Sequence, residues 1–170
     1  MKQALFFFLA LIAANAYAED KLKVSLADAA WDGNHIPAGQ QCARFGGNGS
    51  TPLLKVDQIP NGANALVMEF SDQTYQAMDN GGHGKIGYRI AAGKNSAMIP
   101  SLAGHSFALP KGFFLVEAQR APNWDKAGAY LPPCSGGKGN AYVVTVKAVK
   151  ENAGKVKATL ADATIRLGVY

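Results

Sequence analysis

Cysteine and histidine are scarce in this chain of 170 residues, which restricts the chemistry that it can perform. The three histidines, His35, His83 and His105, are scattered, and neither His35 nor His105 has an acidic neighbour at ligand spacing. A metal centre is therefore disfavoured. The G-x-S-x-G, H-E-x-x-H and C-x-x-C motifs are also missing. We expect no catalytic residues, no metal site and no cofactor, and hence a protein that is not an enzyme.

Clusters of positive charge are missing as well, although the net charge is +5 at pH 7. The basic residues are spread along the chain, without a dense run and without interleaved aromatic residues. Nucleic-acid binding requires a clustered basic patch, so we expect no nucleic-acid partner. Weak attraction to anionic lipid or phosphate is compatible with the charge.

The only long apolar run lies at the N-terminus. Lys2 precedes an apolar stretch from Leu5 to Ala14, and Ala16-Tyr17-Ala18 has the small-x-small pattern of a cleavage site. The stretch is too short for a permanent transmembrane helix. It predicts a secretory signal peptide over residues 1–18, cut after Ala18, and a periplasmic or secreted protein without a stable membrane anchor. The mature chain, residues 19–170, has the size of one domain.

The two cysteines, Cys42 and Cys134, are an even number in a chain that we expect to be exported. Export favours oxidation, and an even count fits one disulfide bond. The alternative is a pair of free, buried thiols. We favour the bond.

Short apolar runs broken by Gly, Pro, Asn and Asp dominate the remaining sequence and indicate a mostly β fold. The only helix that we consider covers Lys155 to Ala163, and Gly154, Val156 and Thr159 weaken it. Two loops, Asp72–Lys85 and Arg120–Asn140, are long for a small β domain, and long ordered loops often carry sites. The expected strands are 22–26, 65–70, 113–118, 142–149 and 164–170.

The segment from His35 to Asp72 resembles the start of the phosphatidylethanolamine-binding protein family, in particular its bacterial, Raf-kinase-inhibitor-like branch. The matching elements are Ile36-Pro37, Cys42, Ser50-Thr51-Pro52-Leu53, Ile59-Pro60-Asn61-Gly62 and the strand-end Asp72. Further matches are His83, the Pro-Cys turn at Pro133-Cys134, Tyr142 and the C-terminal Leu167-Gly168-Val169-Tyr170. The resemblance implies an antiparallel β-sandwich of this family's type with little helix, and it places both cysteines beside the same pocket.

By the same resemblance, the ligand-binding residues are Asp72, His83, Pro133, Asn140 and Tyr142. The family's P-D-A-P motif after the aspartate is lost, its His-Trp pair has become His83-Gly84, and its second pocket histidine is Asn140. His83, Asn140 and Tyr142 supply hydrogen-bond donors for an anion. We expect Asp72 to accept a hydrogen bond from His83 and to raise its pKa.

The resulting hypothesis is an exported binding protein for a small anionic or phosphorylated ligand, acting alone or on a protein partner such as a protease. Two alternatives stay open. One is a hydrolase that uses His83 and Asp72, and the other is a secreted effector whose pocket is vestigial.

Overall fold

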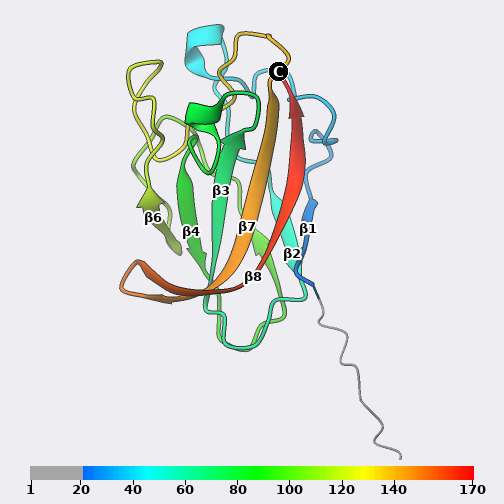
Figure 1. Cartoon of the computed structure of the whole chain (residues 1–170), viewed down its shortest axis with the longest axis vertical. Coiled ribbons are helices and arrows are strands. Elements are labelled where there is room, and N and C mark those ends of the chain that lie inside the picture. The colour runs from blue at the N-terminus through cyan, green and yellow to red at the C-terminus, as the bar shows by residue number, and fades with distance from the viewer. Residues whose placement is uncertain (1–20) are drawn as a thin grey trace, which may run out of the picture.

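The computed structural model describes residues 21–170, which form two antiparallel sheets (Figure 1). The predicted signal peptide lies outside the described residues. One sheet has three strands in the order β1-β2-β5, and the other has five in the order β6-β4-β3-β7-β8. The strands are β1 Lys23–Leu26, β2 Leu54–Asp57, β3 Ala65–Asp72, β4 Lys85–Arg89, β5 Ser96–Ile99, β6 Phe113–Glu117, β7 Ala141–Asn152 and β8 Lys155–Val169. Within the described part of the chain, the helical segments are two short 3-10 turns, η1 Ala43–Phe45 and η2 Gln76–Met78.

The mostly β prediction is confirmed, and the expected strands coincide with β1, β3, β6, β7 and the second half of β8. The considered helix over 155–163 is wrong, because those residues form the first half of β8. This half pairs with β7 from Asn152↔Lys155 to Val146↔Ala163. Ala153 and Gly154 both have positive φ, 49° and 80°, which is the backbone of the two-residue turn that joins strands tightly. Residues 155–163 thus pair through their backbone with β7, and a helix over these residues would lose that pairing.

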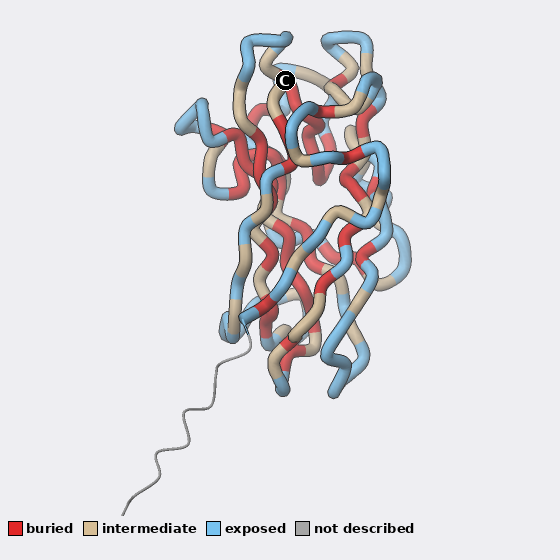
Figure 2. The backbone as a smooth tube through the Cα atoms, turned by 90° about the vertical axis from the view of Figure 1, so that its right-hand side faces the viewer, coloured by how far each residue is buried: buried red, intermediate tan, exposed pale blue. Residues whose placement is uncertain are grey.

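The main hydrophobic core lies between the sheets. Leu54 and Val56 of β2 face Leu66, Met68 and Phe70 of β3 across it, and Val144 and Val146 of β7 continue it. These positions alternate along each strand, as one face of a pleated strand requires. Figure 2 shows the buried segments running through the middle of the molecule, with exposed loops at both ends. Because β3 is central and almost wholly buried, it is a rigid support for the loop that begins after Asp72.

Strand pairing brings the two long loops together at one end of the larger sheet. Asp72, the last residue of β3, lies opposite Tyr142 near the start of β7, and Tyr142 lies opposite Gly168 of β8. The C-terminus ends in the same region, at the top of Figure 1. The loops after Asp72 and before Ala141 therefore gather over one end of the sandwich. None of the helical segments in residues 21–170 is long and apolar enough to cross a membrane.

On the outer face of the larger sheet, a second small cluster forms from Ala65, Val67, Phe114 and Val149. Gly87 of β4 lies directly opposite Phe114 of β6. A Cβ atom built on Gly87 would lie 2.0 Å from the Phe114 ring. The ring thus occupies the space that a side chain at position 87 would need, and it also stacks against the Arg89 guanidinium at 4.6 Å.

We therefore predict that Gly87→Ala destabilises the protein by about 1–3 kcal/mol, because the new methyl group displaces the ring. Urea unfolding of the purified variant measures the change. In a Phe114→Ala background the ring is gone, so the same substitution should cost much less, as a double-mutant cycle would show. Equal costs in both backgrounds would contradict this packing.

Candidate functional site

A cavity of about 680 Å³ opens at the end of the sheet where the long loops meet. Four of the five expected ligand-binding residues, Asp72, His83, Asn140 and Tyr142, line it. Pro133 is not among the lining residues. It is buried behind them, where its carbonyl accepts a hydrogen bond from the Cys42 backbone N–H at 3.0 Å. The other lining residues are Arg44, Phe45, Thr74, Tyr75, Trp124, Cys134, Ser135, Gly136 and Lys138.

Asp72 is 3% exposed and uses both carboxylate oxygens. Its Oδ1 accepts from the backbone N–H groups of Thr74 at 2.9 Å and Tyr75 at 3.2 Å. Its Oδ2 accepts from Nδ2 of Asn140 at 2.6 Å. Asp72 therefore stabilises the turn after β3 and also presents a negative charge in the pocket.

His83 is 2% exposed and is held by the segment around Leu131. Its ring Nδ1 lies 2.8 Å from the Leu131 carbonyl oxygen, and its own carbonyl accepts from the Leu131 N–H at 2.9 Å. The expected hydrogen bond between His83 and Asp72 is not formed, so that prediction is wrong. The competing partner is a backbone carbonyl 48 residues further along the chain. The other ring nitrogen, Nε2, is buried without a hydrogen-bond partner.

The pKa of His83 is lowered from its ordinary value, which also reverses the expectation from sequence. Burial of the imidazolium is the main cause, because a charge loses its hydration in the interior. The Leu131 carbonyl and the Asp72 charge act in the opposite direction but do not compensate. His83 is therefore a neutral side chain at neutral pH.

Tyr142 lies beside His83, with the two rings edge to face and their centroids 5.3 Å apart. Its Oη accepts from the Cys134 backbone N–H at 3.1 Å. Burial, with a further contribution from the Asp72 charge, raises the pKa of Tyr142 to about 12. Tyr142 is thus a neutral phenol that belongs both to the core and to the pocket floor.

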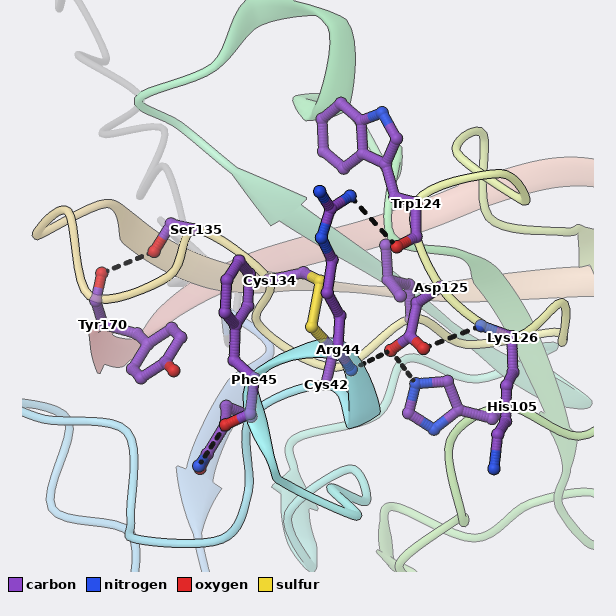
Figure 3. The surroundings of a disulfide bond; sticks show 12 residues. Cys42, Arg44, Phe45, His105, Trp124, Asp125, Lys126, Cys134, Ser135 and Tyr170 are labelled. Carbon is purple, nitrogen blue, oxygen red and sulfur yellow. Dashed lines mark hydrogen bonds and ion pairs between the residues drawn. A yellow bond between two sulfur atoms is a disulfide. The ribbon is translucent and has the colours of Figure 1, made fainter.

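The Cys42–Cys134 disulfide is present, with 5.2 Å between the Cα atoms (Figure 3). Of the two cysteines, Cys134 lines the pocket. Residue Arg44 of η1 lies two positions after Cys42 in the same loop. Its backbone N–H donates to Asp125 at 3.2 Å and its Nη1 to the Trp124 carbonyl at 3.3 Å. Asp125 also bonds Nε2 of His105 at 2.7 Å. The disulfide and this carboxylate together fix the η1 loop against the loop around Trp124.

Three aromatic side chains surround the pocket and remain well exposed: Phe45 at 40%, Tyr75 at 46% and Trp124 at 38%. The Tyr75 and Trp124 rings lie 5.5 Å apart, and the Arg44 guanidinium lies 5.9 Å from the Phe45 ring centroid. No sequence pattern singled out these residues, nor Arg44 and Lys138. The only signal was their position in or beside long loops. The ion pair of His105 and Asp125 was also missed, because its partners are 20 residues apart.

Comparison with known proteins supports the fold. No protein-family model matches the sequence, and no curated protein sequence matches it either. Among solved structures, the chain is similar to Escherichia coli YbcL, described as a new member of the mammalian PEBP family. The TM-score is 0.59 at 20% identity, over 88% of this chain and 98% of that one. It is also similar to CT736 of Chlamydia trachomatis, described as a putative phosphatidylethanolamine-binding protein homologue, with a TM-score of 0.53 at 19% identity over 88% and 97%.

This protein therefore has the fold of the phosphatidylethanolamine-binding proteins, and the resemblance seen in its sequence is confirmed at the level of the fold.

We predict that replacing both cysteines, as in the Cys42→Ala/Cys134→Ala variant, lowers the free energy of unfolding by about 2–5 kcal/mol, because the bond closes a long loop of the unfolded chain. Urea unfolding without reductant measures it. Dithiothreitol should bring the wild type close to the variant and leave the variant unchanged. A loss well below about 1 kcal/mol would contradict a stabilising role of the bond.

A second prediction concerns pH. Because the pKa of buried His83 is lowered, the unfolded chain binds a proton at this residue more readily than the folded protein. Its contribution to stability is complete above the ordinary histidine pKa of 6.5 and is lost as the pH falls below that value. The free energy of unfolding should therefore fall more steeply on acidification in the wild type than in His83→Gln. His35 and His105 are retained in both proteins and serve as internal controls. Identical slopes would show that His83 is not a buried neutral group.

Proposed function

We propose that this protein is an exported binding protein that holds a small anionic or phosphorylated molecule in the pocket between Asp72 and Trp124. The observation that carries the proposal is the layering of the pocket. A buried polar floor, made by Asp72, His83 and Tyr142, lies beneath an exposed rim of aromatic and cationic side chains. Pockets with a few convergent polar groups are the usual sites of small-molecule binding.

The rim suits a ligand that has both charge and apolar surface. Arg44 and Lys138 supply positive charge for acidic oxygens. Phe45, Tyr75 and Trp124 supply ring faces for an apolar or aromatic portion of the ligand. The export element of the proposal is supported by the N-terminal sequence pattern and agrees with the disulfide.

Binding has more support than turnover. A hydrolase built on His83 and Asp72 would need the carboxylate to orient the imidazole, and here the Leu131 carbonyl takes that position. Modulation of a protein partner, such as a protease, is retained as part of the proposal. The exposed rings surround the pocket opening, so a protein bound over it would compete with the small ligand.

We predict that Arg44→Gln and Lys138→Gln each weaken binding of phenyl phosphate by about three- to tenfold at low salt, because each removes one positive charge near the anion. Isothermal titration calorimetry of the purified chain measures the affinity. Lys94→Gln is the matched control, since Lys94 lines a different depression with Gln58 and Asn61. Absence of phenyl phosphate binding, or an equal loss in the Lys94 variant, would contradict the proposed site.

A further inference from the structure

The floor of the pocket offers a ligand hydrogen-bond acceptors, because its donors are already used within the protein. A carbonyl oxygen can only accept, so the 2.8 Å contact to Leu131 requires that His83 Nδ1 carries the hydrogen. In the neutral imidazole, Nε2 is then an acceptor with a free lone pair. This atom is buried without a partner in a side chain that lines the pocket. Only a small group inserted below the rim can approach it.

The neighbouring polar groups also leave a ligand with acceptors rather than free donors. Asp72 is a carboxylate, and the Nδ2 of Asn140 is already used on it. The hydroxyl of Tyr142, the other donor of the floor, interacts with the same carboxylate. The Ser135 hydroxyl donates to the Tyr170 carbonyl at 2.6 Å. The positive charge of the pocket comes from Arg44 and Lys138, which belong to its rim, and not from the buried floor. A fully deprotonated anion that entered the floor would place its oxygens against a carboxylate and a lone pair.

We propose that the pocket selects an acidic ligand that still carries a proton, namely the monoanion of a phosphate monoester or of inorganic phosphate. The P–OH group donates to His83 Nε2, and the remaining oxygens face the positive charge of Arg44 and Lys138. A phosphodiester and a sulfate monoester have the same charge but no O–H group, so the floor rejects them. This inference rests on the proposed function and specifies which member of the phosphoryl class the site takes.

The protonation states of the groups around His83 agree with this arrangement. The titratable groups that face His83 are Asp72, from the end of β3, and Tyr142, from the start of β7. Burial lowers the pKa of His83 and raises that of Tyr142 to about 12, so both stay neutral near pH 7. The proton in the bond between ligand and His83 must therefore come with the ligand.

The test is a calorimetric titration of the purified chain with three probes: phenyl phosphate, methyl phenyl phosphate and phenyl sulfate. We expect phenyl phosphate to bind at least about tenfold more tightly than the other two at pH 6, because only it can donate to the floor. Its affinity should fall about tenfold per pH unit above its second pKa, which is near 6 for phosphate monoesters.

The ligand, not the protein, should set the pH midpoint of that fall. Phenylphosphonate has a higher second pKa, so its affinity should persist to higher pH. Similar binding of all three probes, or one common midpoint for phosphate and phosphonate, would overturn the inference and leave the proposed function standing. If no probe binds at any pH, the proposed function itself fails.

Asp72→Asn provides a near-isosteric variant that removes the charge and keeps an oxygen for the Thr74 and Tyr75 N–H groups. We expect phenyl sulfate to bind about tenfold more tightly to it than to wild type, and phenyl phosphate to change less. The unfolding midpoint of the variant verifies that it is folded. An unchanged preference in a folded variant counts against the inference, and the wild-type titrations decide it independently if the variant does not fold.

Discussion

The site depends on a short network of backbone hydrogen bonds that fixes His83 between two segments distant in sequence. On one side, the His83 N–H donates to the Phe70 carbonyl, and the Gly84 carbonyl accepts from the Phe70 N–H, so residues 83–84 extend the pairing with β3. On the other side, the Leu131 N–H donates to the His83 carbonyl. With the backbone bound on both sides, the ring has little freedom, and its Nδ1 meets the Leu131 carbonyl. The tautomer and the direction of Nε2 both result from this constraint. The neutral state of the ring results from its burial.

Gly84 explains how the two segments come so close. Its φ is +123°, and a Cβ atom there would lie 2.2 Å from the Ala129 carbonyl oxygen. A larger residue would push the 129–131 segment away and remove the carbonyl that holds His83. The sequence pattern that this chain resembles has tryptophan at this position. The presence of glycine in place of that tryptophan is thus linked to the way His83 is held, because it lets the 129–131 segment come close enough for its carbonyl to reach the ring.

Parts of this arrangement were predictable from sequence, and the reasons are physical. β3 and β7 are long apolar runs, so their existence is visible locally, whereas β2, β4 and β5 have four or five residues each and no such pattern. Asp72 and His83 were found through the resemblance, and their convergence in the pocket agrees with it. The predicted rise in the pKa of His83 was wrong, because it is outweighed by complete burial, which no local sequence pattern reveals. The predicted bond to Asp72 was wrong, because Nδ1 meets a carbonyl 48 residues away. The aromatic rim was missed because loops acquire their positions from tertiary contacts, here the disulfide and the Asp125 bonds.

The presence of asparagine rather than histidine at position 140 changes the pocket by more than the loss of one charge. A histidine at this position, as in the pattern that the chain resembles, would bring a second titratable ring to the floor. The carboxamide instead donates to Asp72 at 2.6 Å and brings no charge of its own. Asp72 therefore has a neutral amide and a neutral imidazole beside it, and the cations of the pocket are Arg44 and Lys138 of the rim. The separation of a negative floor from a positive rim thus results from one substitution and one buried imidazole. It favours ligands whose acidic group has both a proton to donate and a charge to present.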